Sequence, residues 1–294
     1  MTATVPKPSK ASSSQSDWAL LLLPGMIWGA SFLFIAESLD ALAPNGITFA
    51  RMVIGFAALS LVPGARRPVL ASDRIGIGWL GLLWMAFPMS MFPYAEQHVS
   101  SALTGMLNGA IPLIAAVVAA ILARQAPSRS VITGLSIGFA GSILMAIPGL
   151  NAGKSSAQGV LMIAAALISY GVSINLARPL QQRNGALPVV WRAQGVSMLL
   201  TAPLGLPALL QAHWSLRSLL AIAALGLLGT ALANVVMADA AGKLGATRAS
   251  ATGFLIPVVA LILGLIVRGE QVPLLAIGGG ALCLAGAWLV RRGA

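Results

Sequence analysis

Charged residues are scarce in this sequence of 294 residues: only 9% are Asp, Glu, Lys or Arg, whereas 58% are hydrophobic. Soluble domains carry about 25% charged residues, so this chain could not cover a water-facing surface. Apolar runs follow one another from Ala19 to Val290, and a helix needs about 20 apolar residues to cross about 30 Å of hydrocarbon. The composition therefore predicts an all-α integral membrane protein.

Cysteine and recognisable catalytic motifs are also nearly absent. Cys283 is the only cysteine, which excludes an internal disulfide, a Cys-based zinc site and an iron–sulfur cluster; among Gly, Leu and Ala, it is expected to be a small packing residue. The sequences GIGWLG (76–81) and GLSIG (134–138) resemble nucleotide-binding and nucleophile motifs, but they lie in apolar runs rather than in strand–turn–helix context. The second suits a stripe of small residues between close helices better. We expect no enzyme activity, metal or cofactor.

Polar residues, prolines and glycines divide the chain into ten candidate membrane spans. Their limits are 18–36, 45–63, 75–95, 99–122, 129–148, 157–177, 187–210, 217–240, 248–267 and 272–290. The short loops leave no room for a soluble catalytic or nucleotide-binding domain. Residues 1–17 are rich in Ser, Pro and Lys, which favours a disordered cytoplasmic tail over a cleavable signal.

The net charge of +11 would suggest nucleic-acid binding in a soluble protein, but here the basic residues lie between the spans. Three of them fall on one side of the predicted membrane: Lys154, Arg217 and Arg268. Thirteen fall on the other side: Lys7, Lys10, Arg66, Arg67, Arg74, Arg124, Arg129, Arg178, Arg183, Lys243, Arg248, Arg291 and Arg292. Because Lys and Arg accumulate in cytoplasmic loops, both termini are predicted to be cytoplasmic.

The two halves of the sequence repeat each other in the same order, at an offset between about 141 and 145 residues. IWGASF (27–32) matches SYGVSI (169–174), FARMV (49–53) matches VWRAQ (190–194), and LGLL (80–83) recurs at 225–228. GAIPLIAAV (109–117) matches FLIPVVALI (254–262), and two glycines of 129–148 recur in 272–290. Because each half has an odd number of spans, five, the second half crosses the membrane in the opposite orientation to the first. We therefore predict inverted five-helix repeats at 18–148 and 157–291, which are typical of secondary transporters.

These features resemble a known family. The Trp-Gly-x-Ser-Phe cluster of the first span, the Arg of the second, the Ile-Pro of the fourth and ninth, and the ending RGEQVPLLAIGGGALCLAGAWLV (268–290) are similar to the EamA-type ten-helix members of the drug/metabolite transporter superfamily. The resemblance covers roughly 18–291, although Arg124-Gln125-Ala126 replaces the usual Gly-Glu.

The resemblance implies a multi-pass exporter of the bacterial inner membrane that works by alternating access, with a cavity lined by the first, third, fourth, sixth, eighth and ninth helices. Within the superfamily the chain is most similar to exporters of aromatic amino acids, so amino acids are the expected substrates. The alternative is export of drugs or other metabolites. A monomer is expected, with a homodimer as the alternative. Proton coupling and facilitated export both stay open, because no acidic residue falls clearly at the membrane centre.

Polar and aromatic residues inside the spans are the candidates for substrate binding. They are Trp28, Ser31, Tyr94, Asn108, Tyr170 and Asn234. Rings could contact a flat substrate, and amides and hydroxyls could bind the amino-acid head. The alternative is that the rings only pack between helices and that the amides join neighbouring helices.

Charges and prolines inside the spans are candidates for gating. Arg51 and Glu96 fall near the predicted outer ends of their spans, whereas Arg192 and Asp239 fall near the inner ends. We hypothesise that an Arg–acid pair closes each mouth in turn; snorkelling of the arginines to lipid headgroups is the alternative. Pro112 and Pro257, at matched positions, are either hinges or static bends.

Overall fold

The structure, a computed structural model, describes residues 15–124, 128–151, 154–237, 252–253 and 255–293. These residues form helices and no strand. The uninterrupted long helices are α1 (Gln15–Leu39), α2 (Pro44–Ser60), α7 (Arg129–Asn151), α8 (Lys154–Asn184), α9 (Ala186–Leu210), α13 (Leu255–Arg268) and α14 (Leu274–Gly293). A short 3₁₀ turn, η1 (Pro63–Arg66), follows α2.

Three of the predicted spans are built from several consecutive segments. The third consists of η2 (Ala71–Asp73), α3 (Arg74–Leu80), η3 (Gly81–Ala86) and α4 (Phe87–Glu96). The fourth consists of α5 (Ser101–Leu107), η4 (Asn108–Ala110) and α6 (Ile111–Ala123). The eighth begins with α10 (Leu216–Ala224) and η5 (Leu225–Leu232) and stays helical to residue 237.

The helices have the length and apolar character of a multi-pass membrane protein. In the described chain, six segments are long and apolar enough to cross a membrane: 22–39, 71–96, 101–122, 156–184, 186–210 and 216–237. Shorter apolar helices cover 129–145, 255–268 and 274–289. Large apolar side chains such as Ile121, Leu204 and Ile266 are exposed on the outside of the bundle, as lipid contact requires. The ten-helix, all-α prediction is confirmed.

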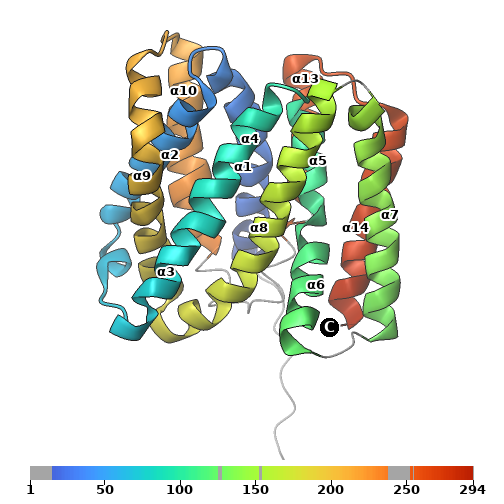
Figure 1. The fold of residues 1–294 in the computed structure, drawn as a ribbon, viewed down its shortest axis with the longest axis horizontal. Helices are drawn as coiled ribbons and strands as arrows, with labels where there is room; N and C mark the ends of the chain where they lie inside the picture. The colour runs from blue at the N-terminus through green and yellow to red at the C-terminus, as the bar shows by residue number, and fades with distance from the viewer. Residues whose placement is uncertain (1–14, 125–127, 152–153, 238–251, 254, 294) are drawn as a thin grey trace, which may run out of the picture.

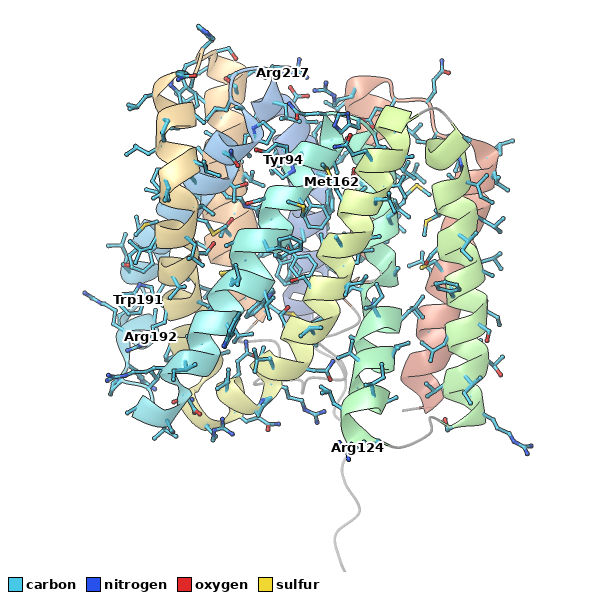
Figure 2. The ribbon with its side chains drawn as sticks, in the orientation of Figure 1. Tyr94, Arg124, Met162, Trp191, Arg192 and Arg217 are labelled. Carbon is cyan, nitrogen blue, oxygen red and sulfur yellow. The ribbon has the colours of Figure 1, made fainter. Side chains whose placement is uncertain are left out.

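The helices run alternately up and down in Figure 1. We call the end that holds Arg217 and the turn 40–43 the upper end, and the end that holds Arg124 and the connection 61–73 the lower end (Figure 2).

Helix packing follows an approximate two-fold symmetry between the halves. The fifth helix, α7, packs against the tenth, α14, and the second, α2, packs against the seventh, α9. The first helix, α1, packs against α13 and against α10 with η5; its counterpart α8 packs against α6 and against α4 with η3. Each of these helices therefore packs against the opposite half, and its counterpart makes the corresponding contacts in return, as the inverted repeat requires.

Glycines allow α7 and α14 to cross closely. A Cβ atom on Gly286 would collide with the backbone of Gly134 and Gly138, and one on Gly141 would collide with the backbone of Gly279 and Cys283. The predicted small-residue stripe is therefore confirmed. Cys283 is 1% exposed within this contact, as expected of a packing residue.

Candidate substrate-binding site

Matched π-helical segments interrupt the third and eighth spans. The repeated Leu-Gly-Leu-Leu (80–83 and 225–228) marks where η3 and η5 begin. In a π-helix each amide bonds five residues back, and such segments are frequent at functional sites.

In both halves a side chain from another helix binds a carbonyl of the π-helical segment. Trp28 Nε1 of α1 donates to the Gly229 carbonyl at 3.1 Å, and Ser169 Oγ of α8 donates to the Leu83 carbonyl at 2.6 Å. The first and sixth helices are therefore held against η5 and η3 by similar bonds, although Trp28 and Ser169 do not occupy matched positions of the repeat. Trp28 was predicted to lie at the site, whereas sequence reasoning missed Ser169, although the LGLL repeat marks its partner.

The fourth and ninth spans are also broken at corresponding places. The 3₁₀ turn η4 precedes Pro112, which lies in the first turn of α6. Residues 252–253 form a similar turn ahead of Pro257, in the first turn of α13. A Cβ on Gly109 would contact the Pro257 ring, so the two breaks lie together. Irregular backbone at membrane depth is tolerated where it is buried in protein or lines a cavity.

Asn108 begins the break in the fourth span. It is buried, and its amide oxygen has no hydrogen-bond partner within the described residues. A buried carbonyl without a partner is costly, so a ligand that donates a hydrogen bond would be stabilised here.

An aromatic cluster joins α1, α4 and α8. Phe32 and Phe92 meet edge to face with centroids 5.5 Å apart, and Tyr170 stacks on Phe92 at 5.9 Å. Trp28 packs against the same core. Two of the predicted aromatic residues, Trp28 and Tyr170, therefore pack against the same core, whereas Tyr94 lies toward the upper end (Figure 2).

The remaining predicted polar residues bond within their own helices. Ser31 Oγ donates to the Ile27 carbonyl at 3.0 Å, and Asn234 Nδ2 donates to the Thr230 carbonyl at 2.6 Å. Ser31 lies against Gly229, the residue that Trp28 binds. The Asn234 oxygen and the free capacity of the Ser31 hydroxyl remain able to accept further hydrogen bonds.

Arg51 is deeply buried beside this cluster. It is the eighth residue of α2, is 4% exposed, and donates from Nε to Thr230 Oγ1 at 3.2 Å. It interacts electrostatically with Tyr170 and with Glu96. Arg51 thus lies nearer the middle of its helix than the sequence suggested, because α2 begins at Pro44 and ends at Ser60 rather than spanning 45–63. Thr230 was not singled out from the sequence.

Glu96 ends α4, and both of its carboxylate oxygens are buried without a hydrogen-bond partner in the described chain. Among the described residues, Arg51 and Glu96 are not in ion-pair contact. Their pairing as a gate remains a prediction.

Arg192, the counterpart of Arg51, faces outward from α9 at the lower left of the bundle (Figure 2). Its Nη1 donates to the Pro188 carbonyl at 3.1 Å, and its guanidinium lies 5.2 Å from the Trp191 ring. The residue of η3 that corresponds to Thr230 is Met85, which offers no hydroxyl to an inward-facing arginine. Asp239, its expected partner, lies outside the described residues.

Ion pairs join the helices at both ends of the bundle. At the upper end, Glu37 of α1 pairs with Arg217 and, at 2.8 Å, with Arg268. Glu270 joins this end to α5 by accepting hydrogen bonds from Ser101 Oγ (2.7 Å) and from the Ser101 and Ala102 amides (3.0 and 2.8 Å).

At the lower end, Asp73 accepts two hydrogen bonds from Arg183, at 2.8 and 3.0 Å, and one from Asn184 at 2.6 Å. Asp73 and Arg217 lie 144 residues apart, and Glu37 and Arg183 lie 146 apart. The two ion pairs therefore occupy matched positions with their charges exchanged. The repeat offset relates these residues in the sequence, but Glu37, Asp73 and Arg183 lie outside the predicted spans.

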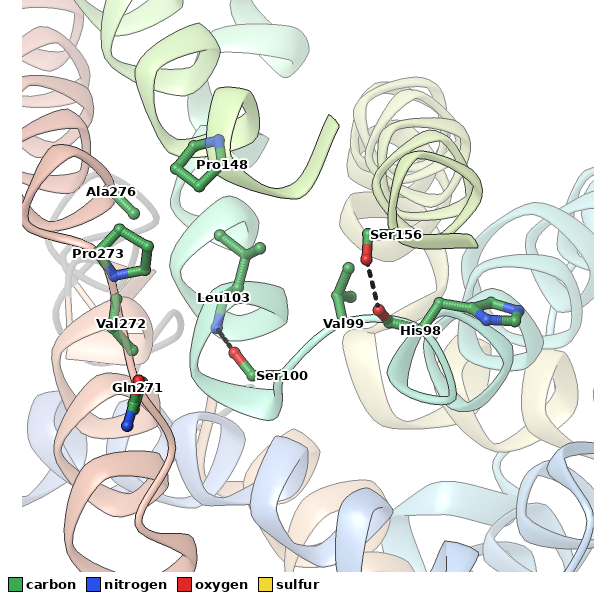
Figure 3. A pocket seen from close by; sticks show the side chains of 10 residues that line it. All are labelled: His98, Val99, Ser100, Leu103, Pro148, Ser156, Gln271, Val272, Pro273 and Ala276. Atoms are coloured by element: carbon green, nitrogen blue, oxygen red, sulfur yellow. Dashed lines mark hydrogen bonds between the residues drawn. The ribbon is translucent and has the colours of Figure 1, made fainter. Parts of the chain in front are cut away.

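A cavity of 210 Å³ opens at the upper end, away from the aromatic cluster. Figure 3 shows its walls, which come from the turn before α5, from α5, from the facing ends of α7 and α8, and from the segment that leads into α14. Ser156 Oγ closes one side by donating to the His98 carbonyl at 3.3 Å. Its small size and peripheral place distinguish it from a central transport site.

Known transporters resemble this chain along nearly its whole length. A "Probable terminal-alkyne amino-acid exporter" of Streptantibioticus cattleyicolor is 28% identical over 95% of this chain and 94% of its own length. The "Uncharacterized transporter YdfC" of Bacillus subtilis is 27% identical, over 88% and 86%. A solved crystal structure superimposes with a TM-score of 0.64 at 21% identity, over 94% of this chain and 96% of that chain. The EamA-like transporter family matches residues 18–147 and 157–292. The chain belongs to the EamA-like transporter family.

Proposed function

We propose that this transporter exports amino acids, mainly aromatic and hydrophobic ones, across the bacterial inner membrane by alternating access. The observation that carries the proposal is the pair of buried, opposite charges beside the aromatic cluster, Arg51 and Glu96. Neither charge is neutralised by an ion pair within the described residues. An isolated buried charge is costly unless it is paired and hydrogen-bonded.

An amino acid carries the two groups that would satisfy these charges. Its carboxylate would bind the two terminal nitrogens of Arg51, since Nε is already used by Thr230, and an arginine fork suits a carboxylate. Its ammonium would bind Glu96 and the free oxygen of Asn108. A zwitterion that bridged Arg51 and Glu96 would neutralise both buried charges.

The aromatic cluster would then receive the side chain of the substrate. Tyr170 stacks on Phe92, Phe32 meets Phe92 edge to face, and Trp28 packs against the same core; such rings favour offset or edge-on contact with another ring. Tyr94, Ser31 and Asn234 would complete the wall. Pro112 and Pro257, next to the broken turns, would serve as hinges when the repeats 18–148 and 157–291 move.

The distribution of charge supports a cytoplasmic lower end. Arg66, Arg67, Arg124 and Arg129 lie there, whereas Arg217 and Arg268 lie at the upper end, and cytoplasmic loops carry the excess of basic residues. The similarity to an amino-acid exporter of Streptantibioticus cattleyicolor supports the substrate class. We propose that the protein acts as a monomer, with both termini in the cytoplasm.

Transport by proteoliposomes tests the substrate class and the role of the two charges. Labelled Phe, Thr, Lys and a cationic dye are compared with two analogues of Phe: N-acetylphenylalanine, which lacks the ammonium, and phenethylamine, which lacks the carboxylate. The wild type is expected to move Phe fastest and both analogues slowly. Glu96→Gln is expected to slow the transport of Phe but to have little effect on N-acetylphenylalanine, which has no ammonium. Arg51→Gln is expected to slow the transport of Phe but to have little effect on phenethylamine, which has no carboxylate.

Asp40→Asn serves as the matched control, because Asp40 is exposed at the upper end. It should leave all rates close to wild type. Equal losses for Phe and its analogues in Glu96→Gln would refute the binding of the head group. A wild type that moves the dye but no amino acid faster than leak would refute amino-acid export and favour the drug exporter instead.

A further inference from the structure

A groove of 360 Å³ opens on the outer face of the lower half of the bundle, where α2, α3 and α9 meet. One wall is aromatic: Phe56 and Trp191 stack with centroids 5.3 Å apart and planes within 15°. Trp191 Nε1 donates to Ser60 Oγ at 2.8 Å, which fixes the ring. Gly78 on the facing helix would have no neighbour within 4 Å of a Cβ atom, so the groove is open there.

Two arginines line this groove, and neither has an acidic partner among the described residues. Arg74 and Arg192 lie close enough to interact electrostatically. Asp73, next to Arg74, is already bound by Arg183 and Asn184, and in the described part of the chain neither groove arginine forms an ion pair. Two neighbouring like charges repel each other, so an anion between them would be stabilised.

The groove continues from these charges into an apolar channel. Ile77, Val196 and Leu199 line it, and Leu199 is largely exposed. Seven residues of α9 separate Arg192 from Leu199, which is about 10 Å toward the membrane centre. Trp191 lines the groove together with both arginines and lies beside Arg192 in the lower half of the bundle (Figure 2); tryptophan favours the interface between lipid and water. The order of charge, aromatic ring and apolar surface corresponds to a phospholipid.

We propose that this groove binds an anionic phospholipid from the leaflet at the lower end, with its phosphate between Arg74 and Arg192 and an acyl chain along Val196 and Leu199. A phosphodiester accepts hydrogen bonds from two guanidiniums, and basic pockets between membrane helices on the cytoplasmic side bind anionic headgroups. The proposal does not depend on the transported substrate. It assigns Arg192 to lipid rather than to the transport path.

Native mass spectrometry of the purified protein tests this proposal. The protein is mixed with equal amounts of dioleoylphosphatidylglycerol and dioleoylphosphatidylcholine, which have the same acyl chains. We expect the wild type to retain one phosphatidylglycerol with a preference of about tenfold, since two basic residues face the anionic group. The double variant Arg74→Gln/Arg192→Gln should retain the two lipids nearly equally. Gly78→Leu keeps both arginines but fills the groove, and it should also lose the retained phosphatidylglycerol.

The matched control is Arg66→Gln/Arg67→Gln, which removes two exposed charges at the same end but outside the groove. It should keep the wild-type preference. Loss of the preference in this control to the same extent as in Arg74→Gln/Arg192→Gln would assign the effect to diffuse charge and overturn the proposal. Full retention in Gly78→Leu would overturn it as well, because leucine improves the helix and only obstructs the groove.

Discussion

Glu37→Gln should favour opening of the upper end of the transporter. The Glu37 side chain is 6% exposed and joins α1 to the start of α10 through Arg217 and to the end of α13 through Arg268. Glutamine has nearly the same shape but no charge, so both ion pairs are lost while packing is kept. Only a state in which these helices are together contains the pairs, and the substitution therefore shifts the population toward states in which they separate.

The size of the shift follows from the exposure of the two arginines. Arg217 is 64% exposed, so its pair contributes only about 0.5 kcal/mol. Arg268 is 30% exposed and binds at 2.8 Å, so after screening its pair contributes about 1 kcal/mol. The sum of about 1.5 kcal/mol corresponds to a shift of about tenfold in the ratio of open to closed upper ends.

Cysteine labelling measures this ratio directly. The native cysteine is removed by Cys283→Ala, and Thr104→Cys is introduced as a reporter on α5, where Thr104 is fully buried and α5 packs against α1 and α13. A maleimide can reach the reporter only when these helices separate. Glu37→Gln should raise the labelling rate about tenfold.

Asp40→Asn is the control for a general change of charge at the upper end, and it should leave the rate unchanged. If Glu37→Gln raised the rate no more than Asp40→Asn does, the ion pairs would not hold the upper end closed, and the reasoning would be wrong.

Three further changes test other parts of the structure. Asp73→Asn should remove the lower-end ion pair and slow labelling of the same reporter by about threefold, because the population moves toward states with an open lower end; unchanged or faster labelling would contradict this. Gly286→Leu should lower the free energy of unfolding in detergent by about 3 kcal/mol, seen as a lower melting temperature, because any side chain there meets the backbone of α7. Gly278→Leu should leave the melting temperature unchanged, because a Cβ atom there meets nothing within 4 Å. Trp28→Phe should cost about 1 kcal/mol in the same assay because the Gly229 carbonyl loses its donor; a melting temperature equal to that of the wild type would show that the bond contributes little.

Most of the fold could be predicted from the sequence, because lipid imposes a simple rule on it. A backbone in hydrocarbon must satisfy its own hydrogen bonds, so each long apolar run is a helix and its limits follow from the polar residues. The glycine stripe at 134–138 could also be predicted, since close helix packing suits it better than a nucleophile motif does. The π-helical segments could not be predicted, because the leucine-rich sequence at 80–83 and 225–228 is equally compatible with an α-helix.

The candidate site was predicted in part. Trp28 and Tyr170 could be predicted because aromatic residues stand out in matched positions of the two repeats, and both pack against the same buried core. The role of Thr230 could not be found, since a hydroxyl in an apolar helix usually bonds to its own backbone. Its contact with Arg51 depends on tertiary packing between α2 and η5, which periodicity does not encode.

The π-helical segments bear on how the two halves arose. A π-helical turn accommodates more residues than an α-helical turn, so each such segment shifts the rotational phase of every residue beyond it. In both halves this shift begins within the same four letters, Leu-Gly-Leu-Leu, at Gly81 in one and at Leu225 in the other, and in both a side chain from another helix binds a carbonyl of the segment. A single ancestral five-helix unit that already contained the shift accounts for both copies. In that ancestor two identical chains would have met in opposite orientations, so that the irregular segment of each packed against a helix of the other.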